Sequence, residues 1–322
     1  MQSLLKETRA YRLLGAEEER GELSHAYLLL LDDGRNLRDA LKAFAKILFS
    51  CAKEKTDAQK RVSRLIDEET FADCLFFPEQ GKRFMVEDAE IIGEESQLKP
   101  VEGERKLFVI DGFDFATPAA QNKLLKLLEE PPAGVVFLLG ACTEYPVLPT
   151  VLSRVKTLEI PPFSTEAVQD VLIRNYGDRY ALNDYELCAA ASGGAVGAAQ
   201  EMLDSGGYKQ LVENAFSLCL CKPSELPLVV KKVGDTKRKR ELLSLLRILF
   251  RDGLLCKTGT LQKSVLLKSE TIRLQAIANA YSLSALVYAQ EAISEAEKDV
   301  AFNAYFPQCV ELLLAKIQRK GK

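Results

Sequence analysis

A phosphate-binding pattern without its functional residues stands near the start of the chain, in the run HAYLLLLDDGRNLRDALKAFAKIL. A phosphate-binding loop has the form GxxxxGK[ST]. Its glycines let backbone N–H groups close on phosphate, its lysine reaches the terminal phosphates and its hydroxyl holds Mg²⁺. Aligned without a gap, Leu31 and Asn36 fall on the two glycines, Leu37 on the lysine and Arg38 on the hydroxyl residue. Because Leu37 cannot neutralise an oxyanion and the other side chains crowd the backbone, we expect no ordinary ATP binding here.

One alternative stays open at the same loop. Gly34 is retained, and Arg38 could support a weak phosphate contact, so an active ATPase with an atypical loop is the competing interpretation. Asp32 and Asp33 argue against it, because they add negative charge where phosphate would lie.

Residues 105–160 predict the elements that must position such a site. Short apolar runs of this kind are typical of strands buried in a parallel sheet. Thr117-Pro118 predicts a helix start, since Thr caps free N–H groups and Pro has none to satisfy, and Pro131-Pro132 ends that helix. The predicted strands are Tyr27–Leu31, Leu107–Ile110, Val135–Leu139 and Val155–Ile160, with a helical turn at Leu148–Leu152.

This order of elements, with NKLLKLLEEPP at Asn122–Pro132 and Ser153-Arg154 after LPTVL, resembles the ATPase core of bacterial clamp-loader subunits, and most nearly the delta-prime type. The resemblance spans about residues 23–205 and is loose beyond them. It implies an α/β fold with an AAA+-type parallel-sheet core at residues 1–161, a small three-helix lid at 162–206 and an all-α C-terminal collar domain at 207–322.

The resemblance also shows which nucleotide contacts are lost. In that family a magnesium-associated acid ends the strand at the position of Asp111, and the next residue is normally a glutamate that orients water, whereas here it is Gly112. Asp114 could replace that glutamate only with a rebuilt backbone, so Asp111 is more simply interpreted as a strand-end acid that caps nearby N–H groups. An arginine that often contacts nucleotide in the third lid helix is replaced by Ala198.

The pair Ser153-Arg154 is the functional feature that the resemblance preserves. In the family this arginine reaches the ATP of a neighbouring subunit, where a guanidinium can pair two phosphate oxygens. The resemblance therefore predicts no catalytic residue in cis and an arginine finger in trans at Arg154, beside Ser153. The alternative is a structural salt bridge with an acid such as Glu159.

Together these residues predict a non-catalytic subunit of an enzyme complex, the DNA polymerase III holoenzyme. The resemblance implies gamma/tau-type ATPase subunits and a delta subunit as partners, and contact with the sliding clamp and primed DNA through the complex. A further alternative is a DNA-binding module built on the basic cluster Lys231, Lys232 and Lys237–Arg240, although such clusters more often mark a solvated helix start.

Composition narrows the function classes. A net charge of −3 argues against a chain whose main task is to grip phosphate backbones, and a single histidine nearly excludes His-based catalysis. The eight cysteines include no CxxC pair. Some relatives carry a zinc module, and Cys51 stands near its first position without partners from Lys53 to Asp73, so zinc is not expected. No apolar run could span a bilayer and no signal peptide opens the chain, so we expect a cytoplasmic protein without a membrane partner.

The remaining patterns predict mostly helices. His25 is expected to be packed or hydrogen-bonded at a strand entry, Phe84–Val86 to be a strand, and Glu87–Leu98 to be a helix with Ile91, Ile92 and Leu98 inward. Helices are also expected near 4–20, 57–69, 164–174, 184–191, 196–203, 208–220, 224–233, 236–255, 268–297 and 304–319.

Overall fold

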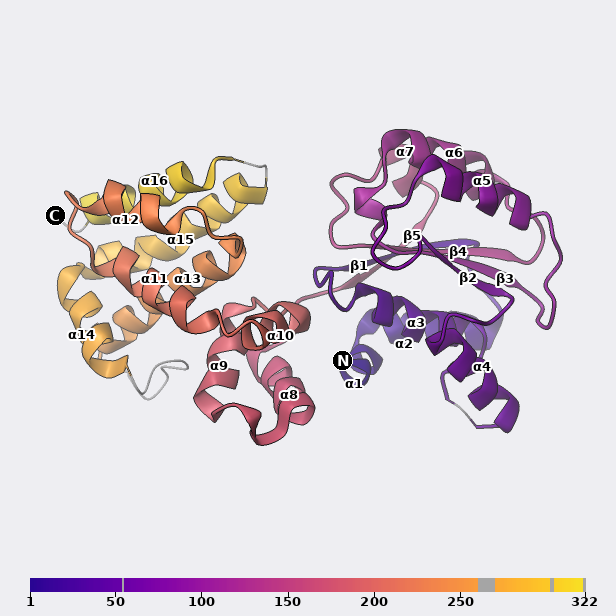
Figure 1. The fold of residues 1–322 in the computed structure, drawn as a ribbon, viewed down its shortest axis with the longest axis horizontal. Coiled ribbons are helices and arrows are strands. Elements are labelled where there is room, and N and C mark those ends of the chain that lie inside the picture. Colours follow the sequence, from indigo (N-terminus) through magenta and orange to yellow (C-terminus); the bar gives the residue numbers. More distant parts are fainter. Residues whose placement is uncertain (54, 260–269, 302–303, 321–322) are drawn as a thin grey trace. The chain divides into compact units, whose positions relative to one another are not determined.

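The computed structural model describes residues 1–53, 55–259, 270–301 and 304–320. Contacts within the chain divide it into two compact units, Met1–Pro162 and Phe163–Lys322 (Figure 1). The boundary falls directly after the Pro161-Pro162 pair.

A five-stranded parallel sheet with the strand order β2-β3-β4-β1-β5 forms the centre of the first unit. The predicted parallel α/β core is thus confirmed. Strands β3 and β4 are buried along their whole length, as parallel strands covered on both faces should be. The strands are β1 (Ala26–Leu31), β2 (Cys74–Phe77), β3 (Lys106–Ile110), β4 (Val135–Ala141) and β5 (Lys156–Ile160).

Helices cover both faces of this sheet (Figure 1). On one face, Phe108 of β3 and Phe137 of β4 stack with their ring centroids 5.6 Å apart in the apolar core. On the other, Gly140 must be a glycine, because a Cβ there would lie 2.7 Å from Leu41 Cδ1. The first face carries α5 (Val86–Glu95), α6 (Pro118–Glu129) and α7 (Pro149–Leu152), and the second α1 (Gln2–Glu7), α2 (Arg9–Arg20), α3 (Leu37–Leu48) and α4 (Asp57–Asp67).

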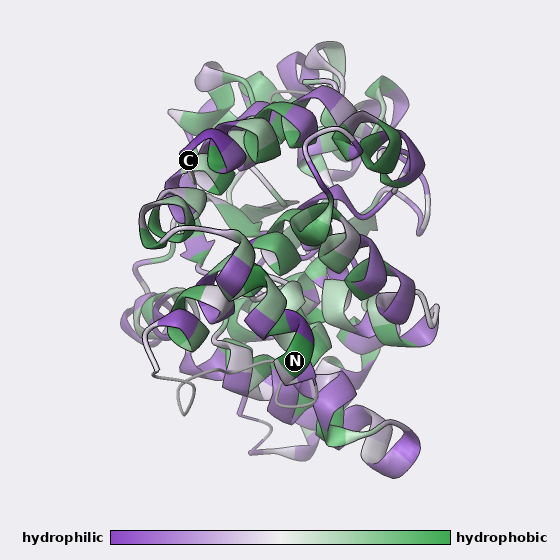
Figure 2. Cartoon of the chain, turned by 90° about the vertical axis from the view of Figure 1, so that its left-hand side faces the viewer, coloured by the Kyte–Doolittle hydropathy of each residue, from purple (hydrophilic) through white to green (hydrophobic). Residues whose placement is uncertain are grey.

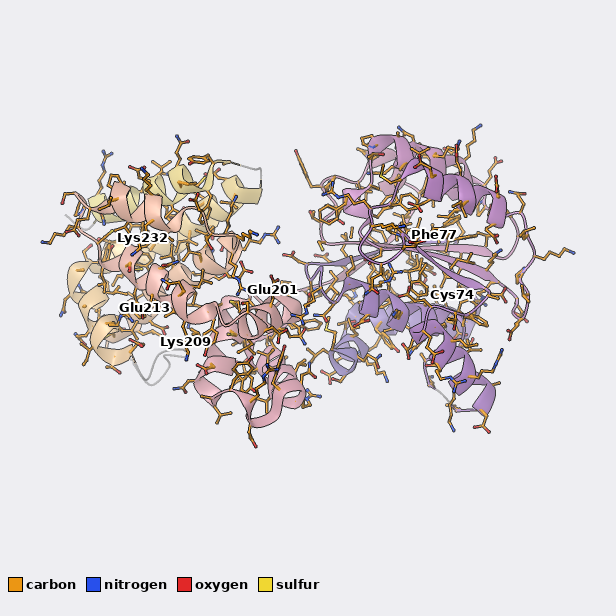
Figure 3. The ribbon with its side chains drawn as sticks, viewed as in Figure 1. Cys74, Phe77, Glu201, Lys209, Glu213 and Lys232 are labelled. Carbon is orange, nitrogen blue, oxygen red and sulfur yellow. The ribbon has the colours of Figure 1, made fainter. Side chains whose placement is uncertain are left out.

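Two predictions for residues 71–98 are wrong. The strand is β2, whose ends Cys74 and Phe77 are labelled in Figure 3, and not Phe84–Val86. Pro78 directly after the CLFF run made it look like a loop, yet an edge strand tolerates a proline at its end. Helix α5 ends at Glu95, and only Ile92 of the three predicted inward residues is buried, whereas Ile91 and Leu98 are exposed.

Two polar side chains fix α6 in place. The Thr117 hydroxyl accepts a hydrogen bond from Ala120 N (3.2 Å) at the helix start, as the Thr-Pro pair predicted. The fully buried Gln121 donates through Nε2 to the carbonyls of Ala116 and Pro146 (both 3.1 Å), and its Oε1 accepts from Leu148 N (2.8 Å). Gln121 thereby ties α6 to the segment that enters α7.

The described part of the second unit is helical, and its helices carry alternating hydrophilic and hydrophobic faces (Figure 2). The predicted helix at 268–297 is wrong in one respect: its described part is two helices that break at Tyr281-Ser282, and residues 268–269 lie outside the described residues. The helices are α8 (Thr165–Tyr176), α9 (Leu182–Ala191), α10 (Val196–Asp204), α11 (Tyr208–Leu220), α12 (Leu226–Val233), α13 (Lys239–Lys257), α14 (Thr271–Ala280), α15 (Leu283–Ala301) and α16 (Phe306–Lys320).

A further division of the second unit into lid and collar stays a prediction, because α9 also packs against α13. Across the described ranges, no helix combines the length and the apolar character needed to cross a membrane.

Candidate functional site

The carboxyl edge of the sheet brings together the loops that follow β1, β3 and β4. Parallel α/β sheets bind ligands at this edge. A Cβ at Gly34 would lie 3.4 Å from Cys142 Sγ, so the loop after β1 lies against the loop after β4. Burial raises the pKa of the Cys142 thiol to about 12, and the nearby carboxylates of Asp114, Asp32 and Asp33 contribute further. This edge is therefore acidic at the position where a phosphate would lie.

The residues aligned with the phosphate-binding pattern serve packing and capping. Leu31 ends β1 and Leu37 begins α3, and both side chains are buried. The backbone N–H of Asn36 donates to Asp33 Oδ1 (3.3 Å), and its side-chain amide donates to Asp33 Oδ2 (2.9 Å). The loop thus directs polar groups at its own aspartate.

The Arg38 guanidinium bridges three segments of the first unit. Nε and NH2 donate to the two carboxylate oxygens of Glu69 (2.7 and 2.6 Å). NH1 donates to the carbonyl of Pro78 (3.1 Å) and to Asp111 Oδ2 (3.4 Å). Only 11% of the Arg38 side chain is exposed. A paired arginine therefore fills the ground between the loop after β1 and the acid that ends β3.

The charges around Arg38 respond to one another. The pKa of Glu69 falls to about 2, chiefly through the Arg38 hydrogen bonds and then through Lys42, whose Nζ lies 2.9 Å from Glu69 Oε1. Burial raises the pKa of Asp111, and the Arg38 charge offsets part of this rise. The interpretation of Asp111 as a cap of N–H groups was incomplete, because its carboxylate forms an ion pair with Arg38.

The backbone at Gly112 bears on the missing glutamate. Gly112 adopts φ 62° and ψ 40°, a left-handed conformation that costs a residue with a side chain roughly 1–2 kcal/mol. A glutamate at this position would therefore be strained as well as absent from the sequence. Asp114, the possible substitute, accepts a hydrogen bond from Cys142 N (3.3 Å) and so serves the backbone after β4.

Arg154 lies between α7 and β5, with its side chain 31% exposed. Nε lies 2.8 Å from Glu129 Oε1, and NH2 contacts the same oxygen. NH1 donates to the Thr150 carbonyl (2.6 Å) and to Ser153 Oγ (3.0 Å). The ion-pair partner is Glu129 at the end of α6, so the prediction that named Glu159 chose the wrong acid.

Sequence reasoning missed two glutamates that contact these arginines. Glu129 stands inside the NKLLKLLEEPP run, so that run already contained the signal for it. Nothing local marks Glu69, which follows α4 and is brought to Arg38 by the fold. His25 was predicted correctly, since its Nε2 lies 2.9 Å from the carbonyl of Leu128.

Other predicted site residues lie in separate surroundings. Ala198 is half-buried on α10 in the second unit. In the basic cluster, Lys232 is exposed in the last turn of α12 (Figure 3). Arg238 NH2 donates to the Glu201 carbonyl (3.1 Å) and to Ser205 Oγ (2.6 Å), which is a structural use. Within the ranges that the structure describes, no group of three or more His, Cys, Asp or Glu residues could hold a metal ion.

Known proteins resemble the first unit in sequence. Residues 6–164 match the family described as DNA polymerase III, delta subunit. DNA polymerase III subunit delta' of Bacillus subtilis is 31% identical over 169 residues, which cover 51% of this chain and 50% of that protein. DNA polymerase III subunit tau of Escherichia coli is 29% identical over 209 residues, covering 62% of this chain and 32% of that protein. The chain thus spans half or less of the length of these relatives.

Solved structures were also similar over most of the chain. A DNA polymerase III gamma subunit-related protein from Thermotoga maritima is 19% identical with a TM-score of 0.42, covering 96% of this chain and 99% of that one. The Bacillus subtilis DNA clamp loader delta protein is 14% identical with a TM-score of 0.34, covering 96% and 99% respectively.

Proposed function

Residues 6–164 of this chain belong to the family described as the delta subunit of DNA polymerase III, and on that premise we propose that the chain is a delta-prime-like clamp-loader subunit. In this proposal the chain neither binds nor hydrolyses ATP. It supplies Arg154 to the ATP of a neighbouring gamma/tau-type subunit while the complex places the sliding clamp on primed DNA.

The Arg38 ion pairs are the observation that carries the proposal. A loop that binds Mg·ATP needs a lysine for phosphate and a free acid for the metal. Here Leu37 is buried at the lysine position, and Asp111 is paired with Arg38. A triphosphate entering the loop would have to displace a nearly buried guanidinium from two carboxylates and then face Asp32 and Asp33. The same pairs weaken the alternative of an active ATPase with an atypical loop.

Arg154 supports the second half of the proposal. Its guanidinium is partly exposed and contacts one carboxylate of its own chain. A fork of N–H donors on an exposed turn is suited to pairing phosphate oxygens across an interface. The sequence similarity to tau and delta' subunits is consistent with partners of the gamma/tau and delta types, in the cytoplasm, with the clamp and DNA reached through the complex.

The finger role can be tested in a loader reconstituted from this chain with gamma/tau-type and delta subunits. We expect Arg154→Ala to lower clamp- and DNA-stimulated ATP turnover by about tenfold. This is less than the 10³ to 10⁵ that such fingers contribute at a single site, since other sites in the complex stay intact. Arg61→Ala is the matched control, because Arg61 forms an equivalent exposed pair with Glu102. Wild-type turnover in the Arg154 variant would contradict the proposal.

The binding half can be tested on the isolated chain. Titration with a fluorescent ATP analogue and Mg²⁺ should show no saturable binding in the micromolar range. Micromolar affinity would favour the active ATPase instead.

A further inference from the structure

Glu129 controls which donors Arg154 can offer. A guanidinium has five N–H donors in a fixed planar arrangement. On Arg154, Nε and NH2 both contact Glu129 Oε1, and NH1 is bonded to the Thr150 carbonyl and to Ser153 Oγ. Four of its donors therefore serve its own chain.

The edge that Glu129 occupies is one that a phosphate would need. Paired N–H donors on one edge of a guanidinium bind two oxygens of a carboxylate or phosphate side by side. The NH1 side is turned to the backbone of α7 through Thr150. The remaining edge, Nε with NH2, faces Glu129, so a phosphate and this carboxylate would compete for the same donors.

The position of Glu129 is not explained by the needs of its helix. It is the last residue of α6, where the helix dipole favours positive charge and disfavours a carboxylate. Glu130 and two prolines follow it, so the helix ends there whatever the residue at 129. Arg154 is the partner that offsets the unfavourable placement of this charge.

The strength of this contact allows its release. The side chains of Arg154 and Glu129 are 31% and 47% exposed, so solvent screens their attraction. An exposed pair of this kind shifts an equilibrium by at most about fivefold. The frame around it is firmer, because the buried Gln121 fixes α6 to the segment before α7. The guanidinium can thus change partner while its supporting turn stays in place.

We propose that Glu129 is a positioning residue that holds Arg154 on its own subunit and competes with the neighbouring subunit's triphosphate for the Nε–NH2 edge. The inference rests on the proposed function, because it requires that Arg154 serves ATP in trans. The triphosphate carries more negative charge than one carboxylate and displaces it, and Glu129 sets the cost of that exchange.

The first test uses the isolated full-length chain and phenylglyoxal, which modifies accessible guanidinium groups. The rate at Arg154 is followed by peptide mass spectrometry. We expect Glu129→Gln and Glu129→Ala to raise this rate severalfold. Glu130→Gln, which removes the same charge one residue later, should leave the rate unchanged, and Arg61 serves as an internal reference. Equal rates in all variants would overturn the proposal without touching the proposed function.

The second test measures ATP hydrolysis in the reconstituted loader. Releasing the guanidinium should raise kcat/KM for ATP by up to about fivefold in Glu129→Gln, the factor of an exposed ion pair. Glu130→Gln and Glu129→Asp should stay near wild type, since the second keeps the charge. A merely structural role of Glu129 would lower activity and not raise it.

The outcomes separate the two proposals. Unchanged or lower kcat/KM in Glu129→Gln, together with a fall in Arg154→Ala, would overturn the holding role and leave the finger. No fall in Arg154→Ala would remove the finger itself.

Discussion

Arg38 and Arg154 are both paired with a glutamate, and they differ in everything that surrounds the pair. Arg38 is 11% exposed and joins Glu69, Asp111 and the Pro78 carbonyl, which come from three separate segments. Arg154 is 31% exposed, and apart from Glu129 its partners are residues 150 and 153 of its own turn.

This difference indicates how the same side chain can be structural in one place and available in another. A charge that is nearly buried must keep its partners, because an unpaired charge in the interior is costly. An exposed pair contributes little and exchanges partners easily. The strand-edge loop has therefore become a piece of the framework, while the turn after α7 has kept a donor that can face outward.

The largest effect that sharpens this comparison is expected for Arg38→Ala. Removing the guanidinium leaves Glu69 and Asp111 without their shared cation beside further acids. We expect the free energy of unfolding of the first unit to fall by about 3 kcal/mol, the lower end for breaking a buried pair. Hydrogen exchange of peptides from β1 and β3 would measure it, with α13 of the second unit as an internal control.

Arg38→Lys is the matched variant, since it keeps the charge and loses the bidentate geometry. It should recover part of the loss. A fall below about 1 kcal/mol in Arg38→Ala would place this pair among ordinary surface pairs and contradict the comparison.

A smaller and pH-dependent effect is expected for Glu69→Gln. The folded-state pKa of Glu69 is about 2 against an ordinary value of 4.5, so the ionised carboxylate stabilises the folded chain above pH 4.5. That contribution declines as pH falls from 4.5 through about 2 and is absent below both values. At pH 7 the variant should lose about 2 kcal/mol, as for a hydrogen bond to a charged group.

The measurement is the difference in strand protection between wild type and Glu69→Gln as a function of pH. The difference should shrink on acidification. Glu102→Gln is the control, because Glu102 pairs with the exposed Arg61 and should show a much smaller loss. A difference that stayed constant with pH would show that the Glu69 charge does not carry the effect.

The elements marked by local signals were predicted well from the sequence. Apolar runs identified β1, β3, β4 and β5, and Thr117-Pro118 identified the start of α6 through its cap. These predictions succeed because each depends on residues a few positions apart. The strand β2 failed because four residues before a proline carry too little pattern to decide.

The partners of the two arginines could not be predicted, because they depend on the fold. Arg38 and Glu69 are 31 residues apart, and Glu69 has φ 56°, which a residue with a side chain rarely adopts. Only the surrounding structure selects that conformation. Gly112 shows the same limit, since its absent carboxylate was visible in the sequence and its left-handed backbone was not.

The smallest expected effect is on the stability of Arg154→Ala, and it decides how the activity of that variant is interpreted. Because the pair with Glu129 is exposed, its loss should change the free energy of unfolding of the first unit by less than about 1 kcal/mol. Hydrogen exchange of peptides from α6 and β5 would measure this beside the Arg38 variant. A loss as large as that of Arg38→Ala would mean that Arg154 belongs to the framework, and a fall in loader activity would then report a damaged subunit and not a missing finger. Near-native protection together with reduced ATP turnover would separate the two arginines as the structure does, one holding its own chain together and the other serving a neighbour.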